Sequence, residues 1–228
     1  EINSTLKEKL LDYSNIVHAY GGLRPLTDTH TESSYKSSRK YEIIDGEKEG
    51  LAGLITVEGG KYTTSRNLAQ SALKVIGKKL GRKLPPSRTA RLPLVGSDMP
   101  GLTDYLASRK EVYPEFASNT LHTLSVNYGT EMEKIVELSQ QNPEWKETLN
   151  DDGEILGQVV FAVREEMAVR LLDVLQRRTG LGTLGMPGDD ALEKIAGCMA
   201  RELGWDENQK KEEIRSAVEK LKLPFLAD

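Results

Sequence analysis

Residues 59–67 read GGKYTTSRN and decide how their part of the chain folds. They follow an apolar, strand-like run at residues 51–57 and begin an amphipathic helix pattern that continues through residue 80. Two glycines let a backbone turn tightly and approach a ligand closely. The stretch therefore predicts a strand, a tight corner and a helix in succession.

The same corner carries the side chains of an anion-binding site. Thr63 and Thr64 can cap the helix and present hydroxyls, while Lys61 and Arg66 place positive charge beside the positive end of the helix dipole. Backbone N–H groups at a helix start bind phosphates and carboxylates. Many strand–Gly-Gly–helix corners are purely structural, so the spacing alone leaves both interpretations open.

Upstream of the corner the pattern predicts short elements. We expect strands at residues 41–44 and 51–57, joined as a hairpin by the turn that begins at Asp45. Residues 16–20 are rich in β-forming residues and have an alternating pattern, which predicts another strand. Residues 5–12 predict a short helix.

Downstream of the corner the pattern is helical. Residues 81–100 are proline-rich and predict a linker, so we place a domain boundary between residues 87 and 88. Apolar steps of three and four then predict helices at residues 119–128 and 131–138, one long helix through residues 160–174, and helices through 192–203 and 214–221. The predicted fold class is α+β and predominantly α.

The composition narrows the function classes. With 38% hydrophobic and 29% charged residues, the chain has the composition of a soluble globular protein. The single cysteine, Cys198, excludes an internal disulfide, suits a reducing cytoplasm and lies in an apolar helix pattern, which predicts a buried thiol. His18, His30 and His122 are scattered and form no Cys/His cluster, so we expect no metal site.

The positive charge is concentrated in one stretch. Residues 59–97 contain nine Lys or Arg and no Asp or Glu. This run is either a solvated helix face or a patch for an anionic lipid or substrate. Nucleic acid is disfavoured, because aromatic residues hardly interleave and the whole chain has a net charge of −4.

Three motifs occur in a fixed order: G-x-R-P-L at residues 22–26, S-R-x-Y at 38–41 and G-G-K-x-T-T-x-R at 59–66. This ordered set resembles the FAD-dependent glycerol-3-phosphate dehydrogenases, which are quinone-linked flavoenzymes. VREEMA at residues 163–168 and DVLQRRTGLG at residues 173–182 are similar to the C-terminal helical domain of that family. The resemblance runs from residue 16 to the end of the chain.

The resemblance assigns site residues. Arg24, Arg39 and Lys61 match family positions that face glycerol 3-phosphate beside the flavin, and Gly60, Lys61, Thr63 and Thr64 match positions around the isoalloxazine ring. Arg binds phosphate oxygens as a bidentate fork and Lys binds them as a point charge, so this set suits a phosphomonoester. Sequence alone also allows each cation to be an exposed loop residue. The family often has an aromatic residue where this chain has Ser65.

One family feature is not found. Such flavoproteins begin with a strand, G-x-G-x-x-G and a helix, which hold the pyrophosphate of FAD. The nearest match, Gly180-x-Gly182-x-x-Gly185, follows a helix pattern and predicts a loop. We therefore expect residues 1–87 to be the C-terminal part of the FAD and substrate domain of a longer protein, followed by a helical domain at 88–228. The family's candidate general base lies upstream, so no catalytic residue is assigned, and we expect this segment alone to bind FAD poorly.

The functional hypothesis is an enzyme part. The whole protein would oxidise sn-glycerol 3-phosphate to dihydroxyacetone phosphate, reduce FAD and pass electrons to quinone, in the cytoplasm and peripherally on the inner face of the cell membrane. One alternative is a glycerol-3-phosphate oxidase that uses oxygen. Another is a helical membrane- or partner-docking module without activity of its own. Arg177 and Arg178 either pair with Glu165, Glu166 or Asp173 or, as the resemblance implies, anchor the helical domain to the rest of the protein.

Overall fold

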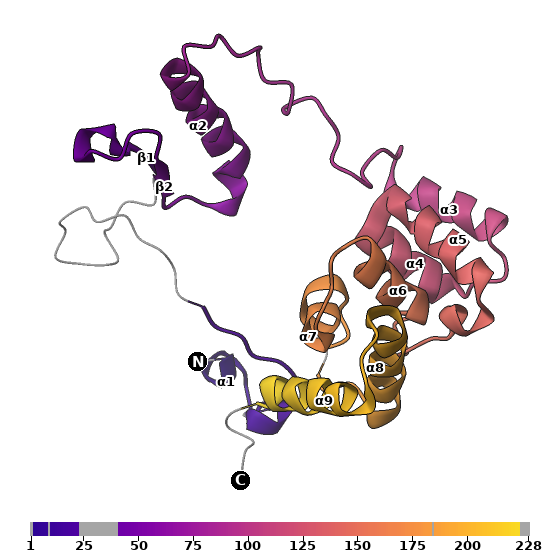
Figure 1. The fold of residues 1–228 in the computed structure, drawn as a ribbon. Helices are drawn as coiled ribbons and strands as arrows, with labels where there is room; N and C mark the ends of the chain where they lie inside the picture. The colour runs from indigo at the N-terminus through magenta and orange to yellow at the C-terminus, as the bar shows by residue number, and fades with distance from the viewer. Residues whose placement is uncertain (1, 9, 23–40, 184, 224–228) are drawn as a thin grey trace. The chain divides into compact units, whose positions relative to one another are not determined.

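The structure is a computed structural model that describes residues 2–8, 10–22, 41–183 and 185–223. The chain divides into two compact units (Figure 1). One unit combines Glu1–Tyr20 with Leu94–Asp228 and is helical. The other spans Gly21–Pro93 and contains a two-stranded sheet and a helix. A largely helical chain with one small sheet confirms the predicted fold class.

The sheet is an antiparallel hairpin. β1, Glu42–Asp45, pairs with β2, Ile55–Glu58, along its full length, which confirms the predicted hairpin. A turn of 3-10 helix, Gly46–Glu49, follows β1. The second strand begins at Ile55 and not at residue 51, because Gly50 and Gly53, with φ angles of 81° and 87°, turn the chain before it.

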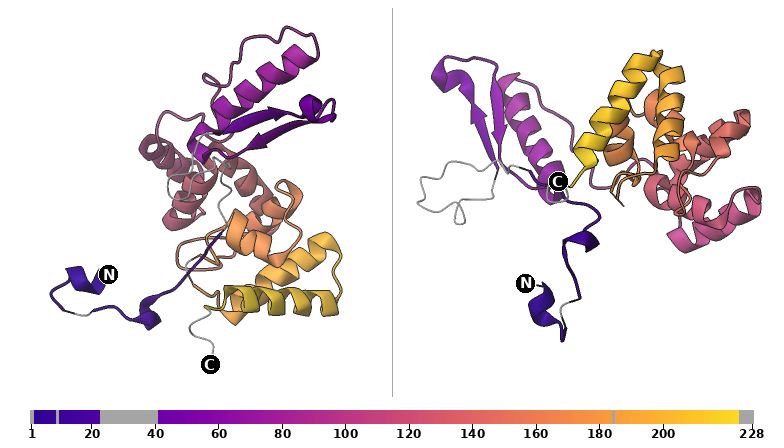
Figure 2. Two further views of the ribbon diagram at one scale, coloured as in Figure 1. Left: turned by 90° about the vertical axis from the view of Figure 1, so that its left-hand side faces the viewer. Right: turned by 90° about the horizontal axis from the view of Figure 1, so that it is seen from below.

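The helix of this unit lies alongside the hairpin in both views of Figure 2. α2, Ser65–Lys79, continues directly from a 3-10 turn, Tyr62–Thr64, and confirms the predicted helix. Near its C-terminal end the Lys79 ammonium contacts the carboxylates of Asp45 at 2.7 Å and Glu47 at 2.6 Å. The far end of α2 is therefore tied to the hairpin by ion pairs.

The larger unit is a set of short helices joined by tight connections. Its longer helices are α3, Leu102–Val112; α4, Ser118–Tyr128; α5, Met132–Gln141; α6, Leu156–Arg164; α8, Asp189–Leu203; and α9, Glu207–Leu221. Shorter elements complete it: α1, Ile2–Thr5; 3-10 turns at Tyr13–Asn15, Gly129–Glu131 and Pro143–Lys146; α7, Leu171–Asp173; and a π-helical turn, Val174–Arg178.

Two apolar clusters form the core of this unit. One gathers side chains of α6, α7, α8 and α9 around Leu171 and Met199, and the other gathers side chains of α3, α4 and α5 around Leu124 and Ile135. Leu138 packs against both clusters and joins them. All four central side chains are fully buried, so this unit encloses a hydrophobic core.

Most of the predicted helices in this unit are confirmed. α4 and α5 match the expected pair and meet at Gly129, and α8 and α9 match the two C-terminal helices. The long helix expected through residues 160–174 is wrong, because α6 ends at Arg164 and helix resumes only at Leu171. Met167 has a left-handed backbone with φ of 59°, which no continuous helix allows. The apolar residues do lie in helices on both sides, but the chain turns between Arg164 and Leu171, so the predicted single helix is two.

Two predictions near the start of the chain are wrong. The helix expected at residues 5–12 is replaced by α1 at Ile2–Thr5, because the Asn3 side chain accepts hydrogen bonds from the Leu10 and Leu11 backbone N–H groups and folds the segment back. The strand expected at residues 16–20 does not form, since no other described strand pairs with it. Alternation predicts a strand only where a partner strand is available.

Among the residues that the structure describes, no helix combines the length and the apolar character needed to cross a bilayer.

Candidate anion-binding site

The corner at residues 59–64 has the backbone geometry that its glycines predict. Gly59 and Gly60 have φ angles of 71° and 110°, where L side chains are strained. A Cβ added at Gly60 would lie 3.2 Å from Leu68 Cδ1, so a side chain there would also crowd the helix. Glycine at this position therefore serves both the turn and the close approach of the corner to α2.

The first helical turn after the corner is closed by Thr64. The Thr64 N–H and its hydroxyl both donate to the Lys61 carbonyl, at 3.0 and 3.1 Å, and the Lys61 N–H donates to the Thr64 hydroxyl oxygen at 3.3 Å. Thr64 is the residue before α2, but its hydroxyl binds backward to Lys61 and not forward to the helix amides. The N–H of Ser65, the first residue of α2, donates to the Tyr62 carbonyl oxygen, so the 3-10 turn already occupies the first amide of the helix.

The side chains of the corner are exposed. Lys61 and Thr63 both lie at the surface, and Tyr62 is 99% exposed. Arg66 donates to the Gln70 side chain at 3.4 Å. Arg24 and Arg39 lie outside the described residues, so the expected gathering of three cations stays a prediction, and of that set the structure places Lys61.

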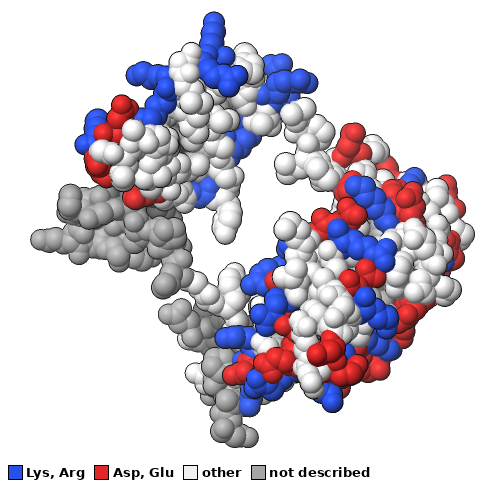
Figure 3. All heavy atoms as spheres, in the orientation of Figure 1, with Lys and Arg blue, Asp and Glu red and all other residues white. Residues whose placement is uncertain are grey.

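Several Lys and Arg side chains lie along α2 in the space-filling view, whereas the acidic side chains of this unit gather at the hairpin (Figure 3). Of the nine cations at residues 59–97, Lys79 has acidic partners within the described part of the chain. Its hydrogen bond lowers the pKa of Asp45 and raises its own pKa. The other eight cations have no ion pair among the described residues.

The sequence analysis gave no role to Tyr41, although it belongs to the S-R-x-Y motif. Its hydroxyl lies 3.1 Å from the Ser71 hydroxyl on α2. The Asp45–Lys79 contact was also missed. Both contacts join residues more than 25 positions apart, and no local pattern marks such pairs.

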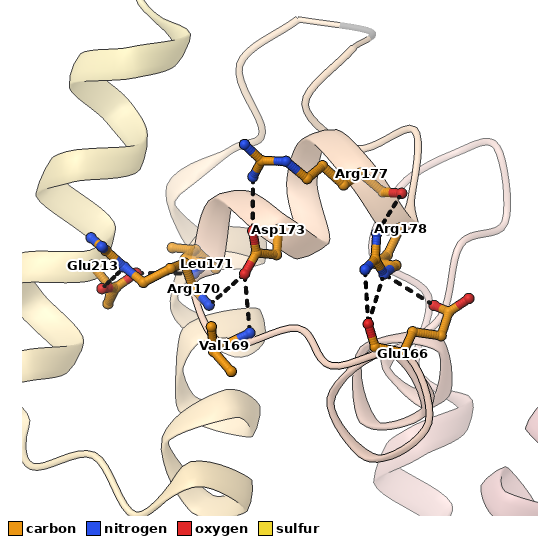
Figure 4. A network of polar contacts seen from close by, with 8 residues as sticks. All are labelled: Glu166, Val169, Arg170, Leu171, Asp173, Arg177, Arg178 and Glu213. Atoms are coloured by element: carbon orange, nitrogen blue, oxygen red, sulfur yellow. Dashed lines mark hydrogen bonds and ion pairs between the residues drawn. The ribbon is translucent and has the colours of Figure 1, made fainter. Parts of the chain in front are cut away.

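The arginines at residues 177 and 178 are satisfied within the helical unit (Figure 4). Arg177 donates to the Asp173 carboxylate at 2.8 Å. Arg178 donates to the Glu166 carbonyl oxygen at 2.8 and 3.2 Å, and its guanidinium lies 3.8 Å from the Glu166 carboxylate. Two of the three predicted acidic partners are thus confirmed, and Glu165 is not one of them. An anchoring role toward the rest of the protein stays a prediction.

The same network explains the break between α6 and α7. The Asp173 carboxylate accepts hydrogen bonds from the Val169 and Arg170 backbone N–H groups at 3.0 and 2.9 Å, which caps the new helix. Burial raises the pKa of Asp173, but these two N–H groups and Arg177 outweigh it, and the pKa is lowered. Glu213 of α9 accepts from the Arg170 guanidinium and from the Leu171 N–H, the latter at 3.0 Å.

The glycine-rich segment after Arg178 is a loop, as predicted, and its Gly180 amide is occupied. The Gly180 N–H donates to the buried Glu154 carboxylate at 2.6 Å, and Asn150 donates to the same carboxylate at 2.9 Å. Burial raises the pKa of Glu154. A Cβ at Gly182 would lie 2.8 Å from the Leu175 carbonyl oxygen, so this glycine serves close packing. The segment does not offer the free amides of a dinucleotide cradle.

The remaining candidate groups that the structure describes do not form a reactive site, and His30 lies outside the described residues. Cys198 is buried as predicted, and burial raises the pKa of its thiol to about 11. His122 is exposed on α4. Within the described ranges, no three His, Cys, Asp or Glu side chains are grouped so that they could hold a metal ion.

Comparison with known proteins defines the class of the helical unit. Residues 87–210 match the family described as the C-terminal domain of alpha-glycerophosphate oxidase. The match covers more than half of the chain, and the chain belongs to this family.

The individual relatives are glycerol-3-phosphate dehydrogenases. The chain is 28% identical over its whole length to the glycerol-3-phosphate dehydrogenase of Synechocystis sp., of which it covers 41%. It is 29% identical to the mitochondrial glycerol-3-phosphate dehydrogenase of Bos taurus, with 89% of this chain and 28% of that protein aligned. The resemblance inferred from the motifs is confirmed.

A solved structure shares the fold. The glycerol-3-phosphate dehydrogenase from Bacillus halodurans, complexed with FAD, superposes with a TM-score of 0.64 at 26% identity, over 79% of this chain and 37% of that one. The chain therefore spans less than half the length of these relatives.

Proposed function

We propose that this chain supplies the C-terminal part of an FAD-dependent glycerol-3-phosphate dehydrogenase that oxidises sn-glycerol 3-phosphate to dihydroxyacetone phosphate. The observation that carries the proposal is the ordered set of three motifs, ending in an exposed strand–Gly-Gly–helix corner, joined to a domain of the alpha-glycerophosphate oxidase family. The names of the relatives support the substrate, and the FAD complex of the Bacillus halodurans enzyme supports the cofactor.

In this proposal the corner meets both the substrate and the flavin. Lys61, together with Arg24 and Arg39, binds the phosphate of the substrate, and the exposed side chain of Lys61 suits that role. Gly60, Lys61, Thr63 and Thr64 lie against the isoalloxazine ring. Bound FAD would supply the hydride acceptor, and the dipole of α2, whose N-terminal end follows the corner, would stabilise negative charge on the ring.

The corner fits one end of FAD and not the whole cofactor. Gly60 has no side chain to obstruct a flat ring, and Lys61 and Thr63 are exposed beside it. The one segment with G-x-G-x-x-G spacing is a loop whose Gly180 amide is already bonded to Glu154. We therefore propose that this chain contacts the flavin ring, while another part of the whole protein holds the pyrophosphate.

A test of the corner uses the whole enzyme and two matched lysines. Lys61→Ala should lower kcat/KM for glycerol 3-phosphate by roughly 10- to 100-fold, the range for losing a hydrogen bond to a charged group. Lys74→Ala, which removes an exposed α2 cation outside the corner, should change it by less than about twofold. Equal effects of the two substitutions would contradict a phosphate-binding role for Lys61.

A second experiment tests the division of the cofactor site. The chain alone, purified after expression with excess riboflavin, should show little flavin absorbance and no dye reduction with glycerol 3-phosphate. The whole reading frame should show both. Stoichiometric flavin and turnover in the isolated chain would refute the proposal.

The electron acceptor is the second part of the proposal. We propose quinone, and the family description favours a specific rival, an oxidase that passes electrons to oxygen. Stopped-flow reoxidation of the reduced whole enzyme separates them. Fast reoxidation by a soluble quinone and slow reoxidation by oxygen supports the dehydrogenase, and the reverse order supports the oxidase.

A quinone acceptor implies contact with a membrane surface. We propose that the unpaired cations of residues 59–97 hold the protein peripherally on the inner, cytoplasmic face of the cell membrane. Co-sedimentation with anionic vesicles should be strong at low salt and weak at high salt. Salt-independent binding would favour an apolar docking surface, and no binding would remove the membrane contact.

A further inference from the structure

We propose that Tyr41 is a positioning residue that fixes the corner at residues 59–64 relative to α2. The inference rests on the proposed function of that corner. Tyr41 would touch neither substrate nor flavin. It would act through the backbone of Gly60 and the start of the helix that follows.

The base of the Tyr41 side chain lies under the corner. A Cβ built on Gly60 would lie 3.8 Å from Tyr41 Cβ and 3.2 Å from Leu68 Cδ1. The backbone at Gly60 is therefore seated on these two side chains. Glu42 of β1 pairs with Glu58 of β2, so Tyr41 stands beside the point where β2 passes into the corner.

The other end of the same side chain reaches the helix. The Tyr41 hydroxyl lies 3.1 Å from the Ser71 hydroxyl, on the second turn of α2. Tyr41 is half-buried between these contacts. The Tyr41 side chain, just before β1, thus lies beside Gly60 at its base and reaches α2 at its hydroxyl, and it restrains the direction in which the helix start points.

Tyr62, the aromatic residue within the corner, does not hold the corner against α2 in this way. The Tyr62 side chain is 99% exposed. Among the residues that the structure describes, the other polar tie between hairpin and helix is the contact of Lys79 with Asp45 and Glu47, at the opposite end of α2 from the corner. The two ties offer a matched comparison, since one lies at the candidate site and the other far along the helix.

The consequence is geometric. Lys61, which the proposed function places at the substrate phosphate, directly follows Gly60, so a small shift of the corner moves its ammonium relative to that phosphate. Loss of the Tyr41–Ser71 hydrogen bond should therefore weaken substrate binding at the corner without removing any group that contacts the substrate.

The test compares Tyr41→Phe, Ser71→Ala, their combination and Lys79→Met in the whole enzyme. The first two should each raise KM for glycerol 3-phosphate about fivefold with kcat changed less than twofold, the factor for one net hydrogen bond. The combination should equal either single change. Lys79→Met should leave KM unchanged, although it also loosens α2.

Hydrogen exchange provides a readout that does not depend on turnover. Amides of residues 60–65 should exchange about fivefold faster in Tyr41→Phe and in Ser71→Ala than in the unmodified protein or in Lys79→Met. Unchanged exchange at the corner in Tyr41→Phe, or an equal increase in Lys79→Met, overturns the positioning role. If the unmodified enzyme does not oxidise glycerol 3-phosphate, the proposed function fails, and the exchange result still decides the role of Tyr41.

Discussion

The helical unit and the hairpin–helix unit bury their apolar side chains to very different degrees. In the helical unit Leu124, Leu171 and Met199 are fully buried. Among the described residues of the hairpin–helix unit, the buried positions are two glycines, Gly46 and Gly77. Leucines there stay at the surface, with exposed fractions of 53% at Leu51, 49% at Leu54, 53% at Leu73 and 63% at Leu80. One unit is held by a core, and the other by a few polar ties and one hairpin.

This difference in burial agrees with the roles proposed for the two units, a helical scaffold and a part of the flavin and substrate domain. A unit that encloses its own core can fold and serve as a scaffold. A hairpin and helix with exposed apolar faces suit contact with other parts of a protein, as the proposed flavin and substrate domain requires.

The largest expected effect tests the core directly. Leu171→Ala should lower the free energy of unfolding of the helical unit by about 2 to 5 kcal/mol, because it leaves a cavity at a fully buried site. Leu73→Ala, the matched change on α2, should cost less than about 0.5 kcal/mol in this chain. Thermal and urea unfolding measure both. A cost at Leu73 as large as at Leu171 would show that the two units are not held differently.

The next effect tests the polar clamp that restarts the helix at Leu171. Glu213→Ala leaves the Leu171 N–H without its acceptor and frees Arg170, so we expect a loss of about 1 to 3 kcal/mol. Glu219, exposed on the same helix, is the control, and Glu219→Ala should cost less than about 0.5 kcal/mol. Urea unfolding at neutral pH measures both. Similar losses would mean that α9 simply tolerates substitutions poorly.

The comparison of the units also explains what could be predicted from the sequence. Periodicity predicted α2, α4, α5, α8 and α9, because each buries one face against neighbours. It failed at residues 165–170, where the apolar spacing continues across a turn. That turn depends on the Asp173 carboxylate, which accepts hydrogen bonds from two backbone N–H groups, and on the left-handed backbone of Met167. Neither feature can be recognised from the spacing of apolar residues.

The candidate site shows the same limit. The glycines and Lys61 of the corner could be found from their spacing, because a tight turn and a helix start need particular residue types at adjacent positions. Tyr41 and Ser71 could not, since a hydrogen bond between residues 30 positions apart depends on how a hairpin and a helix pack. Arg24 and Arg39 were assigned from the resemblance and stay predictions.

Acidity should act in opposite directions through two carboxylates, Glu154 of the helical unit and Asp45 of the hairpin–helix unit. Burial raises the pKa of Glu154, so the folded state holds this proton more tightly than the unfolded state. Its contribution to stability is therefore greatest below the unfolded pKa of about 4.3 and is lost as the pH rises through the folded pKa. The unfolding free energy of the unmodified protein minus that of Glu154→Gln, measured from pH 4 to 7, should therefore decrease as the pH rises. A difference that grows with pH would contradict it.

Asp45 carries the smallest expected effect and the opposite sign. The Lys79 hydrogen bond, followed by the Glu47 N–H, lowers its pKa below the ordinary 3.8. A depressed carboxylate pKa stabilises the folded state above the unfolded pKa, and that contribution is lost as the pH falls through the folded value. Protection of α2 amides from hydrogen exchange should therefore fall between about pH 5 and pH 3 and should lose this pH dependence in Asp45→Asn. The pair is close to the surface, so salt should weaken the effect, whereas the effect of the buried Glu154 should persist in salt. Equal salt sensitivity of the two would remove the distinction between a unit held by its core and a unit held by surface contacts.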